Sequence, residues 1–330
     1  MNINDIAKHL DVSTSTVSRA LNNKGRLSQE LRKKILSYAS EVNYQPNAFA
    51  LSLKNQHSNT IGIIIPDITN VYNSIFFKYV EEFIKPKGYR AILYNCDEKS
   101  TNEDQYVEYM LNSQVDGMIV ASTGSSAWEI LEEDLLNKVV FVDNLPQISK
   151  RINFVGCDNE KAAYDLTEHL VKKGYTKIAT LVGSIDESTA KDRLTGYLNC
   201  LRDNHLEINP EWIINTGFLY EDGYKKSQNL LSLANTPDSV LAQNNVLAYG
   251  ILRAAQEVGL RIPEDMAIVC FDHIDLYGFM RPRFTSMMQP VKEIAEKASI
   301  MLLNKLNHSS KICKNTQIIL TADLSIGETS

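Results

Sequence analysis

Polar side chains follow the apolar segments in the larger, C-terminal part of this 330-residue chain. These segments stop at Asp or Asn residues: Asp67 and Asn70, Asp143 and Asn144, Asp158 and Asn159, Asn244 and Asn245, and Asp272. Together with Arg193, such carboxylate and amide groups are the hydrogen-bond partners that sugar hydroxyls need, and Tyr72 or Phe218 is able to cover an apolar sugar face. Each Asp or Asn taken singly is equally suited to cap a following helix. As a set, they favour a ligand-binding cleft.

A second group of polar side chains lies near the N-terminus, on one face of a short predicted helix. Val17, Ala20 and Leu21 recur at helical spacing and form its buried face. The outward face then carries Thr14, Ser15, Ser18 and Arg19. Small hydroxyl residues at the helix start, with an arginine one turn later, suit insertion into the major groove of DNA. The alternative is a solvent-exposed polar helix in a protein-interaction module.

The same periodicity predicts the helices that must hold this face in place. The preceding helix has Ile6, Ala7 and Leu10 on one side, and Ser13 is placed to cap the second helix after a tight turn. A third helix follows Ser28, with one apolar face: Leu31, Ile35, Ala39 and Val42. Three short amphipathic helices are enough to close a small core.

Charge separates this N-terminal segment from the rest of the chain. Residues 1–57 contain eight Lys or Arg and four Asp or Glu, a net of +4, which leaves −10 for the remainder of a chain whose net charge is −6. A protein that coats nucleic acid over its whole surface is therefore excluded. The asymmetry indicates a small basic module that faces a polyanion and an acidic body with a different task.

The body alternates β-branched segments with helical ones. Buried parallel strands are predicted at residues 61–65, 91–94, 118–120, 139–142, 177–182, 239–242 and 267–271, with helices such as 106–111 and 162–171 between strands. Residues 83–93 and 170–181 share a pattern of lysines, a glycine and a strand, which implies two similar halves. Two α/β halves that face each other place their strand ends around a cleft.

Several functional classes find no support. The five Cys residues form no CxxC pair and the six His residues show no metal-ligand spacing, so we expect no disulfide scaffold, metal site or cofactor. The chain contains no GxGxxG, P-loop or GxSxG motif, so an enzyme is not expected. No apolar run is long enough for a membrane helix, and the N-terminus is unlike a signal peptide. We expect a cytoplasmic protein with no membrane partner.

Four motifs near the N-terminus follow one another in a specific order: Asp5-Ile6-Ala7, Val12-Ser13-Thr14-Ser15-Thr16-Val17-Ser18-Arg19, Leu21-Asn22 and Asn43-Tyr44-Gln45-Pro46-Asn47-Ala48. Together they resemble the helix-turn-helix headpiece of the lactose/galactose repressor (LacI/GalR) family. The resemblance implies that Thr14 and Ser15 read bases, that Arg19 adds a base or phosphate contact, and that Asn22 anchors the backbone. The full set of DNA-binding residues that it implies is Thr14, Ser15, Ser18, Arg19, Asn22, Asn47, Ala50 and Leu53.

In that family the segment that corresponds to residues 47–54 is a hinge helix, which pairs with its dimer mate in the minor groove. Leu53 occupies the position of the leucine that wedges between base steps and kinks the DNA. Leu51 stands where many members have Arg, so one phosphate contact is missing. A segment this short should not be helical in isolation, and a plain linker is the alternative.

The body resembles the family's effector domain, a two-lobed α/β fold like that of the type I periplasmic binding proteins, at residues 61–67, 189–197, 263–265 and 271–272. With the strand-end residues, the implied effector site is Asp67, Asn70, Tyr72, Asn73, Asp143, Arg193, Phe218, Asn245, Asp272 and Gln289. Asn245 replaces a usual Asp, Cys270 a usual Gly and His273 a usual second Asp. These departures leave the effector's identity open.

The expected organisation is a headpiece at residues 1–57 and an effector-binding and dimerisation domain at residues 61–330. The first lobe is expected at about 61–155 and 287–310, and the second at about 156–286 and 311–330. The chain ends without the coiled coil that makes the lactose repressor tetrameric, which implies a homodimer.

The leading hypothesis is therefore a sequence-specific transcriptional regulator, a repressor of carbohydrate-utilisation genes. It is expected to bind a palindromic double-stranded operator and a small sugar-like effector. The alternatives are a sugar-binding module or a carbohydrate-active enzyme without a DNA role.

Overall fold

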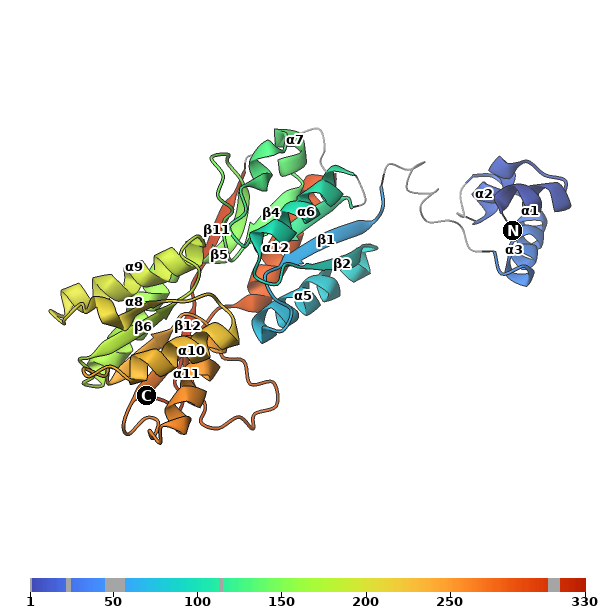
Figure 1. Cartoon of the computed structure of the whole chain (residues 1–330). Coiled ribbons are helices and arrows are strands. Elements are labelled where there is room, and N and C mark those ends of the chain that lie inside the picture. The colour runs from blue at the N-terminus through green and yellow to red at the C-terminus, as the bar shows by residue number, and fades with distance from the viewer. Residues whose placement is uncertain (1, 22–24, 45–56, 113–114, 308–314) are drawn as a thin grey trace. The chain divides into compact units, whose positions relative to one another are not determined.

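The computed structural model describes residues 2–21, 25–44, 57–112, 115–307 and 315–330 (Figure 1). It divides into two compact units, Met1–Asn59 and Thr60–Ser330, each of which is described by itself below. The predicted hinge helix at 47–54, with Asn47, Ala50 and Leu53, lies outside the described residues, as does Asn22.

The first unit, here called the headpiece, contains the three predicted helices. They are α1 (Ile3–His9), α2 (Thr14–Leu21) and α3 (Gln29–Glu41). Their shared core consists of Ile6, Ala7, Val17, Ala20, Ile35 and Ala39, all of them buried. The predicted Ser13 cap is confirmed, because the Ser13 hydroxyl accepts from the Thr16 backbone N–H at 3.1 Å. Ser28 caps α3 in the same way, since its hydroxyl accepts from the Leu31 backbone N–H at 3.3 Å. The stacked rings of His9 and Tyr38, 4.0 Å apart, join α1 to α3.

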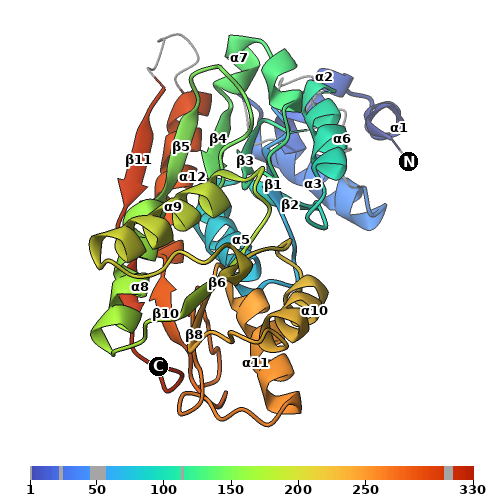
Figure 2. The same cartoon turned by 60° about the vertical axis from the view of Figure 1, so that its left-hand side comes forward.

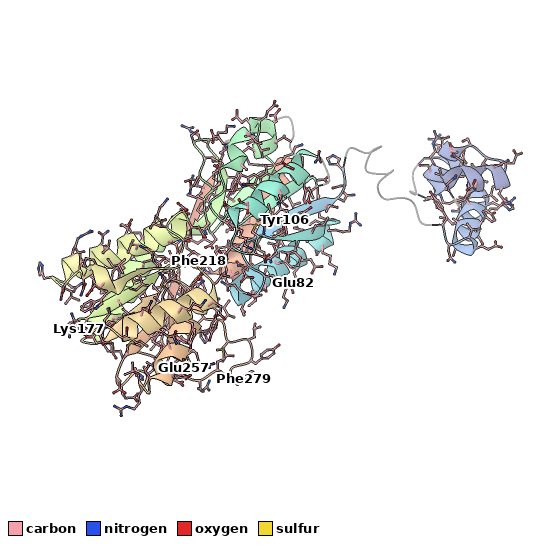
Figure 3. All side chains as sticks on the ribbon, viewed as in Figure 1. Glu82, Tyr106, Lys177, Phe218, Glu257 and Phe279 are labelled. Atoms are coloured by element: carbon pink, nitrogen blue, oxygen red, sulfur yellow. The ribbon has the colours of Figure 1, made fainter. Side chains whose placement is uncertain are left out.

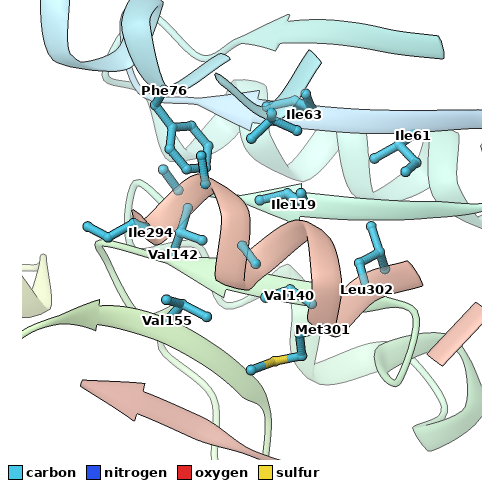
Figure 4. Close-up of a cluster of buried hydrophobic side chains, with 14 of the residues drawn as sticks. Ile61, Ile63, Phe76, Ile119, Val140, Val142, Val155, Ile294, Met301 and Leu302 are labelled. Carbon is cyan, nitrogen blue, oxygen red and sulfur yellow. The ribbon is translucent and has the colours of Figure 1, made fainter. Parts of the chain in front are cut away.

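The second unit, here called the body, contains two six-stranded sheets. The first sheet has the order β11 (Gln317–Leu320), β5 (Asn153–Cys157), β4 (Val139–Val142), β3 (Gly117–Val120), β1 (Thr60–Ile65) and β2 (Arg90–Asn95), with every pairing parallel. One face is covered by α5 (Val71–Ile84) and α12 (Val291–Asn307), and the other by α6 (Ser100–Leu111), η2 (Ala127–Ile130) and α7 (Glu133–Leu136). Figure 4 shows Ile294 and Leu302 of α12 against Ile63, Ile119 and Val140 of the sheet.

The second sheet has the same layered design (Figure 2). Its order is β12 (Asp323–Ser325), β10 (Thr285–Met288), β9 (Ala267–Phe271), β8 (Ser239–Ala242), β6 (Ile178–Val182) and β7 (Ile213–Asn215), with only β12 antiparallel among the described strands. Helices α8 (Asn159–Lys172) and α9 (Ser188–Asp203) cover one face, and α10 (Tyr220–Leu231) and α11 (Asn245–Glu257) cover the other. Short 3₁₀ turns, η1 (Lys85–Lys87) and η3 (Pro210–Trp212), precede β2 and β7.

All seven predicted strands are present, with ends shifted by at most one residue. The expected assignment of residues 311–330 to the second lobe is wrong in part, because β11 pairs in parallel with β5 of the first sheet. Ile318 and Leu320 explain this placement, since both pack against the apolar cluster beneath α12. The chain therefore returns to the second lobe only after Leu320, where β12 joins β10.

The described helices include none that is long and apolar enough to span a membrane.

Candidate functional site

The outward face of α2 is built as the periodicity predicts. Val17 and Ala20 are buried, Thr14, Ser15 and Arg19 are exposed, and Ser18 is half-buried. The Ser13 hydroxyl lies 2.8 Å from the Ser15 hydroxyl and holds the start of the helix. The Arg19 stem packs against Gly25, whose φ is +78° and where a Cβ atom would lie 3.3 Å from Arg19 Cδ.

A cleft between the two sheets of the body collects most of the strand-end residues. Its lining includes nine of the ten predicted effector-binding residues: Asn70, Tyr72, Asn73, Asp143, Arg193, Phe218, Asn245, Asp272 and Gln289. The enclosed space is about 40 Å³. That volume holds only a few water molecules, whereas ligand pockets commonly have about 300 to 1,000 Å³. The structure therefore represents a closed form of the cleft.

Asp143 and Asp272 occupy equivalent places in the two lobes. Asp143 follows β4 and Asp272 follows β9, and both adopt the left-handed conformation, with φ of 59° and 56°. Gln289 bridges them, because its Nε2 atom donates to Asp143 Oδ1 at 3.2 Å and to Asp272 Oδ2 at 2.8 Å. Left-handed backbone is costly for residues other than glycine, and such strain concentrates at functional sites.

Arg193 is a buried cation on the second-lobe side of this cleft. Its Nε atom donates to Asn159 Oδ1 at 2.8 Å, its Nη1 atom donates to the Gln243 carbonyl at 2.5 Å, and its guanidinium lies 4.0 Å from the Phe271 ring centroid. Burial raises the pKa of Asp272 to about 6, although Arg193 and Gln289 act to lower it. Burial also raises the pKa of Asp143, against the same two partners.

Direct hydrogen bonds join the lobes at the rim of the cleft. Asn144, after β4, donates through Nδ2 to Glu187 and accepts at Oδ1 from the Thr189 backbone N–H at 3.0 Å. The Leu145 N–H donates to the Ser188 hydroxyl at 2.9 Å. The loop after β4 in the first lobe is thereby fastened to the N-terminal end of α9 in the second.

Several strand-end residues act as helix caps, and two of these caps also line the cleft. The Asn70 side chain accepts from the Tyr72 N–H at 3.1 Å, and that of Asn244 accepts from the Leu247 N–H at 2.7 Å. Asp158 caps α8 without lining the cleft. Capping and cleft lining are therefore compatible roles for the same side chain.

Asp67 is the one predicted effector residue that is absent from the lining of the cleft, so its part in effector binding stays a prediction. Its carboxylate accepts from the backbone N–H of Thr69 at 3.0 Å and from the Thr69 hydroxyl at 2.5 Å. Asp67 therefore closes the turn between β1 and α5.

Phe218, labelled in Figure 3, precedes α10 and is one of the residues that line the cleft. Its ring lies so close to Gly183 that a Cβ atom there would be 2.0 Å from it. Glycine at position 183, directly after β6, is thus needed for this ring position.

Sequence reasoning did not identify Glu98, Glu187 and Thr189 as lining residues. Glu98 lies three residues after β2, with a φ of 55°, and Glu187 lies five residues after β6. Both acids lie in loops that start at the carboxyl edge of a sheet, a few residues beyond the strand end. A search for polar residues along these whole loops, and not only at the strand ends, would therefore have found them.

Comparison with known proteins gives matches over almost the whole chain. Residues 2–47 match the family described as "Bacterial regulatory proteins, lacI family", and residues 58–325 match "Periplasmic binding proteins and sugar binding domain of LacI family". The HTH-type transcriptional repressor CytR of Escherichia coli (strain K12) is 32% identical over 304 residues, which cover 92% of this chain and 89% of CytR. Catabolite control protein A of Staphylococcus xylosus is 33% identical over 308 residues, which cover 92% of both chains.

Among solved structures, the Lac repressor dimer bound to operator and the anti-inducer ONPF is similar in fold. Its TM-score is 0.82 at 22% sequence identity, with 100% of this chain and 98% of that chain covered.

Proposed function

Since the chain belongs to the LacI family of DNA-binding transcriptional regulators, we propose that it binds a palindromic operator as a homodimer under the control of a sugar-like effector. The proposed genes are those of carbohydrate utilisation, the proposed action is repression, and the proposed place of action is the cytoplasm. Family membership removes the alternatives of a sugar-binding module or an enzyme without a DNA role.

The observation that carries the DNA side of the proposal is the polar face of α2 over a packed core. Thr14, Ser15 and Arg19 are exposed, while Val17 and Ala20 fix the helix against α1 and α3. A helix held in this way presents its N-terminal side chains to base edges in the major groove. A homodimer supplies two such helices, and its two-fold symmetry requires a palindromic site. Asn22, Asn47, Ala50 and Leu53 complete the proposed contact set.

The cleft supports the effector side of the proposal. Carboxylate, amide and guanidinium groups from both lobes converge on one space, with Phe218 as the aromatic side. Because that space is about 40 Å³, a monosaccharide enters only when the lobes separate. A ligand that binds the open and closed forms unequally shifts the balance between them, and operator affinity follows by linkage.

Selection of DNA from a randomised library by the full-length chain tests the DNA half. The expected product is a two-fold symmetric sequence, and sedimentation of the complex should give two protomers per site. Enrichment of a single asymmetric half-site, bound by one protomer, would contradict the homodimer.

Thermal unfolding with sugars, sugar phosphates and nucleosides tests the effector half, since a ligand of the native state raises Tm by mass action. The Arg193→Ala variant should lose the shift. An unchanged shift in that variant would place the effector elsewhere.

A further inference from the structure

Helix α9 of the second lobe takes no cap from its own N-cap residue. That residue is Glu187, and within the described segment 115–307 its side chain accepts no hydrogen bond from the first turn of the helix. The free backbone N–H groups at a helix start need acceptors, and a buried one without a partner is costly. Thr189 is only 2% exposed, so its N–H group must find an acceptor within the protein.

The first lobe supplies that acceptor. Asn144, in the loop after β4, is 3% exposed, and its Oδ1 atom accepts from the Thr189 backbone N–H at 3.0 Å and from the Ser188 hydroxyl at 3.3 Å. Its Nδ2 atom donates to the Glu187 carboxylate, which has no other donor among the described residues. An Asn that accepts from the second N–H of a helix is a typical N-cap. Here the cap and the helix belong to different lobes.

Two further hydrogen bonds fasten the same part of the second lobe to the first. The Leu145 N–H donates to the Ser188 hydroxyl at 2.9 Å, and Gln147 Nε2 donates to the Asp186 carbonyl at 3.1 Å. These two hydrogen bonds and the three that Asn144 makes are here called the latch.

The latch needs no ligand, because both partners of each of its hydrogen bonds belong to the chain. The cleft that it closes has about 40 Å³, too little for a monosaccharide. Asn144, Glu187 and Thr189 all line this cleft, so a ligand that enters it meets groups of the latch. Closure of the lobes and occupancy of the cleft therefore compete for the same polar groups.

We propose that the latch keeps the body closed while the effector is absent, and that the effector opens the lobes and takes over hydrogen bonds of Glu187 and Thr189. This inference rests on the proposed function, because it specifies how the effector of that cleft shifts the balance between the closed and open forms. A ligand that closes two lobes around itself would act in the opposite direction. Asn144 is then a positioning residue, and its loss should act as the effector does.

Replacement of Asn144 by Ala should open the lobes. The change removes three hydrogen bonds and leaves the Glu187 carboxyl and the Thr189 N–H without partners until the lobes separate and water reaches them. Buried polar groups that lose their partners are more costly than the lost bonds alone. The ratio of closed to open form should fall by about tenfold or more, which corresponds to about 1.4 kcal/mol.

Hydrogen–deuterium exchange of the full-length chain measures this opening, because backbone N–H groups of Leu145 and Thr189 are donors in the latch. Each variant is read at the N–H group whose acceptor it leaves in place. Asn144→Ala should speed exchange at Leu145, and Ser188→Ala should speed exchange at Thr189, by about tenfold or more. A saturating sugar that raises Tm should speed both in the wild type. Slower exchange with that sugar would overturn the inference.

Operator binding gives a second readout, with a matched control. Without effector, Asn144→Ala should bind the selected operator as the effector-saturated wild type does. Asp158→Ala is the control, because Asp158 caps α8 within its own lobe and does not line the cleft. It should lower Tm, since a helix loses its cap, but leave exchange at Leu145 and operator affinity as in the wild type.

The outcomes separate the latch from the proposed function. If a sugar raises Tm and alters operator affinity, but Asn144→Ala exchanges and binds operator like the wild type, the proposed function stands and the latch is overturned. If no sugar raises Tm, the effector half of the proposed function is contradicted, and opening by an effector with it. Faster exchange at Leu145 in Asn144→Ala would in that case still support the latch as the device that holds the lobes closed.

Discussion

The headpiece and the cleft present their polar groups in opposite ways. In the headpiece, Thr14, Ser15 and Arg19 stand exposed on one helix above a dry apolar core. In the cleft, Arg193, Asn245 and Asp272 are themselves buried and come from loops and helices far apart in the chain. An exposed face meets its partner without rearrangement, whereas buried groups meet a ligand only after the lobes move. The first arrangement suits reading DNA, and the second suits sensing.

The largest expected effect is a loss of operator binding when the exposed face of α2 is removed from the headpiece. Replacement of Thr14, Ser15 and Arg19 by Ala together should weaken specific operator binding by about a hundredfold or more, since each base contact contributes about 1–3 kcal/mol. Fluorescence anisotropy with the selected operator and a scrambled duplex measures the loss. Glu41→Gln, at an exposed position on α3, should bind like the wild type. Retention of specific binding by the triple variant would show that α2 is not the recognition helix.

A second prediction tests whether the two cores are independent. Ile35 in the headpiece and Ile63 in the body are both fully buried, and truncation of either to Ala should cost about 2–5 kcal/mol in its own unit. Ile35→Ala should abolish operator binding and leave the main thermal transition in place, because the body holds most of the residues. Ile63→Ala should lower that transition. If Ile35→Ala lowered it as much, the units would share one cooperative core.

The smallest effect concerns pH and belongs to the cleft. Glu98 and Asp272 have raised pKa values of about 8 and about 6, so the folded chain binds protons that the unfolded chain releases. The stability that this binding contributes is present in acid and is lost as pH rises through those values. Between pH 5 and 8 the free energy of unfolding should fall by about 1–3 kcal/mol, as urea titrations at several pH values will measure.

Variants sharpen this pH prediction. Glu98→Gln should flatten the pH dependence, and the headpiece variant Ser15→Ala should leave it as in the wild type. An undiminished slope in Glu98→Gln would mean that the acid excess in the cleft does not govern stability.

The difference between the two regions also explains what the sequence could predict. The recognition face depends on residues within one turn of each other, so the spacing of Val17 and Ala20 was enough to place Ser15 and Arg19 outward. The strands could also be predicted from short stretches of sequence, because a run such as 61–65 is apolar and is buried over its whole length. Nine of the ten effector residues that the strand-end pattern and the family resemblance predict then line the cleft, which has fifteen lining residues in the described part of the chain.

Long-range placements were the ones that sequence reasoning missed. Glu98 and Glu187 meet only because two separate sheets face each other, and neither residue stands directly at a strand end. The return of β11 to the first sheet depends on where Ile318 and Leu320 find apolar partners, which a short strand with alternating burial does not reveal. The role of Asp67 cannot be predicted from sequence alone, because an Asp side chain accepts hydrogen bonds from turn backbone and from ligand hydroxyls equally well.

The central claim is that occupancy of the cleft controls the headpiece. The most direct test is the Kd of the full-length chain for its selected operator, measured with and without a saturating amount of the sugar that gives the largest Tm shift. The predicted result is a change of about fivefold to 150-fold, the usual range of coupling between two sites, and its loss in Arg193→Ala. An identical Kd in the presence of a sugar that raises Tm would contradict the claim.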